Sequence, residues 1–92
     1  MNHISLDDIF KLSFEKLPHI IRVIILKNDE ECVCRKEGLK NLLSFADVDT
    51  EHLFKGRLQL SKSDGKIDIQ VKKEFIGTVS LEVFKKALSN LK

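Results

Sequence analysis

The residues best suited to chemistry in this sequence are the two cysteines, Cys32 and Cys34. Two thiolates could bind a metal ion together with His19 or His52. A structural zinc site, however, draws on two ligand pairs with recognisable spacing, and the second pair is missing. A thiol redox site uses the Cys-x-x-Cys spacing at a helix start, which is also absent. We therefore expect two reduced thiols pointing the same way from a strand, with no metal site and no cofactor.

No catalytic constellation stands out among the other polar residues. The histidines, His3, His19 and His52, fall near the expected ends of elements, and a general base needs a partner group and a pocket. The acidic pair Asp7-Asp8 is explained by the start of a helix, where the helix dipole favours negative charge. No Gly-rich phosphate loop or nucleophile motif occurs among the four glycines. The sequence predicts a protein that is not an enzyme and has no catalytic residues.

Positive charge is concentrated in the C-terminal part of the chain. Residues 1–54 carry a formal charge of −3 and residues 55–92 carry +5. The alternative functional hypothesis is therefore nucleic-acid binding by the outward face of one hairpin. Its candidate residues are Lys55, Arg57, Gln59, Gln70, Lys72 and Lys73. Against it stand three acids on the same element, the absence of Tyr and Trp, and our expectation that Phe54 and Phe75 belong to the core.

That hairpin, within residues 54–76, is the clearest structural signal in the chain. Asp64-Gly65 suits a two-residue type I′ turn, in which both central residues need positive φ. The resulting register pairs apolar with apolar residues on one face and polar with polar residues on the other. The expected polar pairs are Ser61 with Asp68, Gln59 with Gln70, and Arg57 with Lys72. The expected core residues are Leu58, Leu60, Ile67, Ile69 and Val71.

The other elements complete an α+β fold. Leu6, Ile9, Phe10, Phe14 and Leu17 recur at helical spacing and predict a first helix that ends at Pro18. Strands at 19–27 and 32–34, a helix over 37–46, the hairpin, a strand at 75–79 and a helix capped by Ser80 follow. A tight turn at Lys73-Glu74 would make the last three strands a meander, and a long bulged strand is the alternative. The expected order is α-β-β-α-β-β-β-α in a single domain, 1–92, with a mainly antiparallel sheet. We see no internal repeat.

The partner expected first is another protein, with self-association as a twofold dimer. Ile20 to Leu26 is almost entirely apolar, so both faces of this strand must be covered, and sheet edges also need partners. This favours a small interaction or regulatory module over the nucleic-acid alternative. No apolar run approaches the length of a membrane span, and the N-terminus lacks a signal-peptide pattern. We therefore expect a cytoplasmic protein with no membrane partner.

Overall fold

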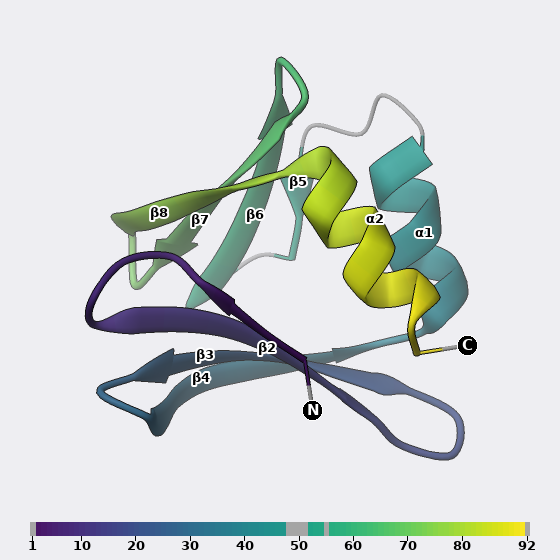
Figure 1. Ribbon diagram of the computed structural model, residues 1–92, viewed down its shortest axis with the longest axis horizontal. Helices are drawn as coiled ribbons and strands as arrows, with labels where there is room; N and C mark the ends of the chain where they lie inside the picture. The colour runs from purple at the N-terminus through teal and green to yellow at the C-terminus, as the bar shows by residue number, and fades with distance from the viewer. Residues whose placement is uncertain (1, 48–51, 55, 92) are drawn as a thin grey trace.

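The computed structural model describes residues 2–47, 52–54 and 56–91 and contains two four-stranded antiparallel sheets and two helices (Figure 1). Sheet A contains β1 (Asn2–Ser5), β2 (Phe10–Lys16), β3 (Ile21–Lys27) and β4 (Glu30–Glu37), and α1 (Leu39–Asp47) follows it. Sheet B contains β5 (His52–Leu53), β6 (Leu58–Ser63), β7 (Lys66–Val71) and β8 (Glu74–Ser80), and α2 (Leu81–Ser89) follows it. In each sheet the strands are ordered as they follow in sequence. The predicted α+β class is confirmed, but the strands form two sheets instead of the single sheet that was expected. The two halves share one topology, although no repeat is recognisable in the sequence.

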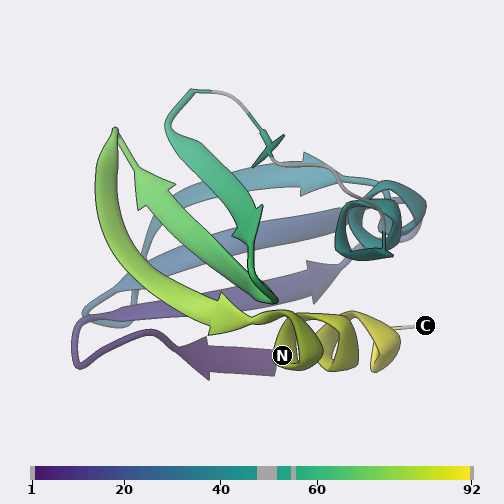
Figure 2. The same ribbon diagram turned by 90° about the horizontal axis from the view of Figure 1, so that it is seen from above.

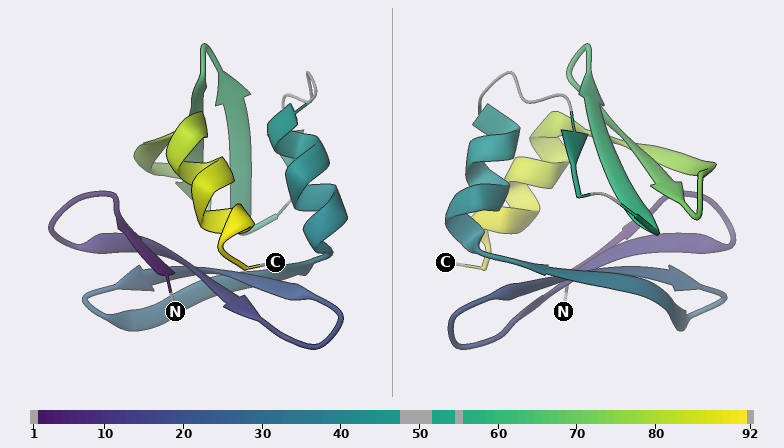
Figure 3. Two further views of the ribbon diagram at one scale, coloured as in Figure 1. Left: turned by 45° about the vertical axis from the view of Figure 1, so that its right-hand side comes forward. Right: turned by 180° about the vertical axis from the view of Figure 1, so that it is seen from behind.

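Sheet A forms the base of the molecule, and sheet B and the helix pair stand on the same face of it (Figures 1 and 2). The two helices contact each other beside sheet B (Figure 3). A continuous hydrophobic core fills the space between these layers. At its centre the ring of Phe84 on α2 packs edge-on against Phe14 of β2 and Phe45 of α1, with ring centroids 5.6 and 6.0 Å apart. This shared core joins the two halves of the chain.

The predicted N-terminal helix is wrong, because residues 2–5 and 10–16 form β1 and β2 instead. Strand β3 is apolar and needs a partner strand on each side, and β2 supplies one of them. On β2, Leu12 and Phe14 belong to the hydrophobic core, while Ser13 between them is buried on the opposite face, where it pairs with Ile24. The expected helix start is a turn, in which the Asp7 carboxylate accepts hydrogen bonds from the amides of Ile9 and Phe10 at 2.8 and 2.7 Å.

The hairpin prediction is confirmed in its register. Leu58 pairs with Val71, Gln59 with Gln70, Leu60 with Ile69, and Ser61 with Asp68. Asp64 and Gly65 have φ values of 50° and 75°, as a type I′ turn requires. The five residues expected in the core, Leu58, Leu60, Ile67, Ile69 and Val71, are all buried.

Both helices expected after residue 36 are present. The second predicted helix corresponds to α1, and the last to α2. The Ser80 hydroxyl accepts a hydrogen bond from the amide of Val83 at 3.1 Å, so its predicted role as N-cap is confirmed. None of the described helices is long and apolar enough to cross a membrane.

The last three strands form the expected meander, but the turn lies one residue earlier than predicted, at Lys72-Lys73. Both lysines have positive φ, of 53° and 69°. In β8 the pairing register shifts at Ile76, three residues after the turn. Strand β4 repeats this pattern: it follows a turn at Asn28-Asp29 with positive φ, and its register shifts at Cys32. The two hairpins β3–β4 and β7–β8 are thus built alike.

Lys62 ties sheet B to the end of α1. Its register partner Ile67 is buried, and its ammonium group donates to the carbonyl oxygens of Phe45 and Ala46 at 3.1 and 3.3 Å. A cation at a helix C-terminus satisfies carbonyls that have no partner within the helix. We expect Lys62→Met to lower the free energy of unfolding by about 1–2 kcal/mol in urea denaturation. Lys66→Met, at an exposed position in the same hairpin, is the control and should change it by less than about 0.5 kcal/mol.

Candidate functional site

Strand β4 is an edge strand of sheet A, and no other described strand pairs with its outer side. It is eight residues long and lies nearest the viewer in the right panel of Figure 3. Its exposed residues are acidic at the start, Glu30-Glu31, and basic towards the end, Arg35-Lys36. Edge strands present backbone donors and acceptors that can pair with another chain. The fold therefore leaves at this edge an extended backbone with two exposed acids at its start and two exposed cations just before its last residue, the half-buried Glu37.

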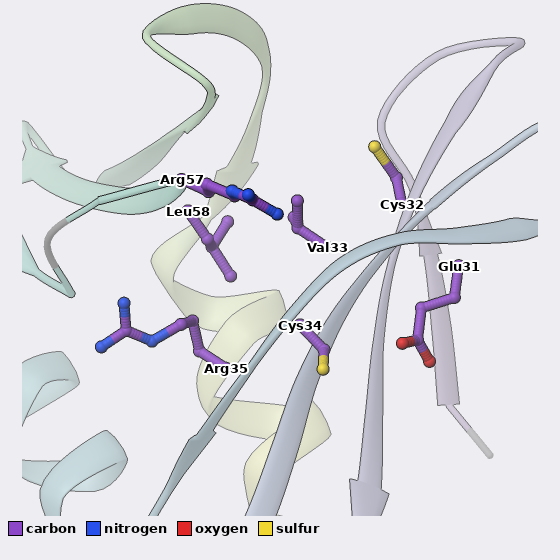
Figure 4. A pocket seen from close by; sticks show the side chains of 7 residues that line it. All are labelled: Glu31, Cys32, Val33, Cys34, Arg35, Arg57 and Leu58. Atoms are coloured by element: carbon purple, nitrogen blue, oxygen red, sulfur yellow. The ribbon is translucent and has the colours of Figure 1, made fainter.

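A pocket of about 300 Å³ opens beside this edge, between the two sheets (Figure 4). Arg35 comes from β4, and its guanidinium lies over the ring of Phe54 at 5.1 Å from the centroid. Arg57 comes from the residue before β6. The pocket residues are Glu31, Cys32, Val33, Cys34, Arg35, Arg57 and Leu58. Two guanidinium groups from different sheets thus give the pocket a positive character on the side of sheet B.

The two cysteines do not point the same way, which corrects our expectation. The register shift leaves Cys32 without a partner of its own on β3, and it packs against the core on the same side as Val33. Cys34 pairs with Ile24 on the outer face of sheet A, and Figure 4 shows the two thiols on opposite sides of β4. A β-bulge inserts one residue and so reverses the alternation that follows it. The thiols cannot act together on one ligand in this arrangement.

Arg22 organises the outer face of sheet A. Its guanidinium forms ion pairs with Glu15 on β2 at 2.7 Å and with Glu31 on β4 at 2.6 Å, and it lies 3.6 Å from the Cys34 sulfur. These bonds, with Glu15 the strongest, raise the pKa of Arg22 above its ordinary value. The side chain therefore links β2, β3 and β4 on this face. Ile24, two residues further along β3 on the same face, is only 4% exposed, so the prediction that this strand is covered on both faces holds at Ile24.

The expected nucleic-acid surface is only partly assembled. Gln59 and Gln70 are cross-strand partners on the outer face of sheet B, and Gln59 also donates to the carbonyl of Gly56 at 3.2 Å. Arg57 and Lys72 are exposed neighbours, because the Lys72 amide donates to the Arg57 carbonyl at 2.7 Å. Lys73 is exposed beside Lys72 in the turn. Lys55 lies outside the described residues.

Sequence reasoning missed Phe75, which we expected in the core. Phe75 is 59% exposed and is the cross-strand partner of Gln70 on the outer face of sheet B. The neighbouring Ile76 is buried instead. The predicted turn at Lys73-Glu74 would already set Phe75 opposite Lys72 on the outward face, so the strand alternation contained this signal, and the structure pairs Phe75 with Gln70 on the same face. The exposed ring of Phe75 therefore lies on the same surface as Gln59, Gln70, Lys72 and Lys73.

The histidines are not brought together. All three are exposed, and they lie on β1, in the loop before β3 and on β5. Among the described residues there is no group of three or more His, Cys, Asp and Glu side chains that could hold a metal ion. Comparison of the chain with protein-family models, with curated proteins and with solved structures found no match. The features of the molecule that could serve a function are the edge of β4 with its pocket and the outer face of sheet B.

Proposed function

We propose that this protein is a non-enzymatic interaction module that associates with a second copy of itself through the outer edge of β4. The observation that carries the proposal is the length and charge pattern of this edge. Strand β4 is the longest of the described edge strands, whereas β5 has two residues and β1 has four. Strand β8 has seven residues but carries charge at its acidic start only.

The charges of β4 complement each other across a twofold axis. When two copies of one strand pair antiparallel, the start of each lies beside the end of the other. The acidic start of one copy, where Glu30 is exposed and Glu31 is ion-paired with Arg22, would then lie beside Arg35 and Lys36 of the second. Cross-strand pairs of opposite charge stabilise such a contact, and like charges would destabilise it. Arg57 lies beside the same edge and adds a third cation near the acidic end of the incoming strand.

The expected association is weak and reversible. Pairing at one edge buries less surface than the standard interface of about 1,600 Å². The bulge at Cys32 also interrupts the regular part of the edge. We therefore expect a dissociation constant in the micromolar range, with the ion pairs contributing specificity more than affinity.

Charge reversal at the two ends of β4 tests the proposal. Glu30 and Lys36 are both exposed, so Glu30→Lys and Lys36→Glu should leave the fold intact. Wild-type protein should dimerise between micromolar and sub-millimolar concentration in sedimentation equilibrium. Each variant alone should be monomeric in that range, because like charges then face each other at both ends. An equimolar mixture of the two variants should recover a dimer that contains one copy of each.

The matched control places the same reversals on α2. Glu82→Lys and Lys86→Glu alter exposed residues away from β4 and should dimerise like the wild type. A monomeric wild type throughout the range would contradict the proposal. So would β4 variants that dimerise as well as the wild type, because association would then use another surface.

A further inference from the structure

The two equivalent hairpins of the molecule differ in their turn residues. The β3–β4 turn uses Asn28-Asp29, and both residue types tolerate positive φ. The β7–β8 turn places Lys72 and Lys73 in the same conformation, although lysine rarely adopts it. Two adjacent positive charges at one turn also repel each other. Neither the positive φ of the two lysines nor their mutual repulsion stabilises the fold. The two lysines therefore indicate a role for this turn at the surface.

The residues beside this turn form a compact patch on the outer face of sheet B. Gln59, Gln70 and Phe75 lie in one row across β6, β7 and β8. Lys72 and Lys73 form the turn that follows Val71, beyond the end of that row. We call Gln59, Gln70, Lys72, Lys73 and Phe75 the Phe75 patch. It combines an exposed aromatic ring, two amides and two cations.

Of the acids that argued against nucleic-acid binding, Asp64 and Asp68 lie away from the row of Phe75, and Glu74 adjoins Lys73 and Phe75 in the sequence. Asp64 is in the turn at the opposite end of the β6–β7 hairpin. Glu74 pairs with the buried Val71 and therefore belongs to the other face of the sheet. Asp68 shares the outer face, but it lies in the next row and accepts a hydrogen bond from the Thr78 hydroxyl at 2.9 Å. The cations beside Phe75 are thus not neutralised by the acids of their own hairpin.

We propose that the Phe75 patch binds single-stranded nucleic acid, independently of the association through β4. Phe75 stacks on one base, and Lys72 and Lys73 contact the phosphates beside it. Gln59 and Gln70 supply amide donors and acceptors to base edges or sugars. A duplex is excluded as the favoured ligand, because its bases are already stacked and offer no face to an exposed ring.

Binding is measured with a fluorescein-labelled oligothymidylate and with the same strand annealed to oligoadenylate, at several salt concentrations. The single strand should bind at low salt and more tightly than the duplex. Phe75→Ala should weaken this binding about tenfold, because stacking on one base is lost. The control Val83→Ala removes another exposed apolar side chain, on α2, and should bind like the wild type.

The lysines are tested by a variant that should fold better than the wild type. Lys72→Asn with Lys73→Gly provides a favoured type I′ sequence, so the melting temperature should rise by a few degrees. Its binding should weaken, and the slope of log K against log salt should become shallower by about 1.4, since two phosphate contacts are lost. Lys66→Gln with Lys86→Gln removes the same charge at other exposed positions and should leave the slope unchanged.

Three outcomes would overturn the proposal. The first is no binding of the single strand at low salt. The second is equal affinity of Phe75→Ala and wild type, which would leave only non-specific attraction between charges. The third is duplex binding as tight as single-strand binding, because the ring would then have no part in it. None of these outcomes bears on dimerisation, which Glu30→Lys and Lys36→Glu test separately.

Discussion

Replacing Phe84 by alanine should lower the free energy of unfolding by about 3–5 kcal/mol, the range found for large aromatic side chains removed from a core. Phe84 is fully buried and packs edge-on against both Phe14 and Phe45. The substitution therefore leaves a cavity where sheet A, α1 and α2 meet. The loss of two favourable aromatic contacts adds to the loss of buried area.

Urea denaturation followed by far-ultraviolet circular dichroism measures this effect. Val83→Ala is the matched control, because Val83 is the adjacent residue of α2 and is 45% exposed. It should change the free energy of unfolding by less than about 0.5 kcal/mol. Similar effects of the two substitutions would mean that α2 is not packed as described.

Replacing Gly77 by alanine should destabilise the protein by about 1–3 kcal/mol, because the added methyl group overpacks the core. A Cβ atom at this position would lie 2.9 Å from the Cβ atom of Leu6, in the connection between β1 and β2. Gly77 has no unusual backbone conformation, so the close approach of Leu6 is the reason that glycine is required. The Leu6 atom in question cannot rotate away, since it is fixed to the backbone.

A double-mutant cycle in urea denaturation identifies this contact. Leu6→Gly removes the Cβ atom that clashes. In this background the destabilisation caused by Gly77→Ala should be smaller by about 1 kcal/mol or more. Leu6→Ala keeps that atom and should give no such relief. Equal coupling in the two cycles would contradict the proposed contact.

The sequence predicted the fold well where local signals and long-range pairing agree. In the β6–β7 hairpin, the turn residues and the alternation of apolar and polar residues specify the same register, and that register is present. The helical spacing of Leu6, Ile9 and Phe10 was misleading. Leu6 packs against the core from a loop, and Ile9 is 43% exposed, so these residues share no buried helix face. The need of β3 for a second partner strand decided the structure of this segment.

The candidate surfaces were harder to predict, because they depend on bulges and on single-residue shifts. Cys34 faces Arg22 only because the bulge at Cys32 changes the alternation of β4. Phe75 is the cross-strand partner of Gln70, one residue further from the turn at Lys72-Lys73 than Glu74, and is therefore on the outward face. That turn has no Gly, Asn or Asp, the residues by which such turns are normally recognised. Arg57 and Lys72 are both exposed, as predicted, but Arg57 lines the pocket between the two sheets and Lys72 lies in the turn.

The uncrossed order of both sheets has a consequence for the speed of folding. Every strand pairs only with strands that precede or follow it directly in the chain, so the sheets depend on contacts of short sequence separation. Such topologies have low contact order and fold quickly. The contacts that join distant segments include those of the Phe84 cluster, of Leu6 with Gly77 and of Lys62 with the end of α1. We therefore expect each hairpin array to form early and the docking of the two halves to limit the rate.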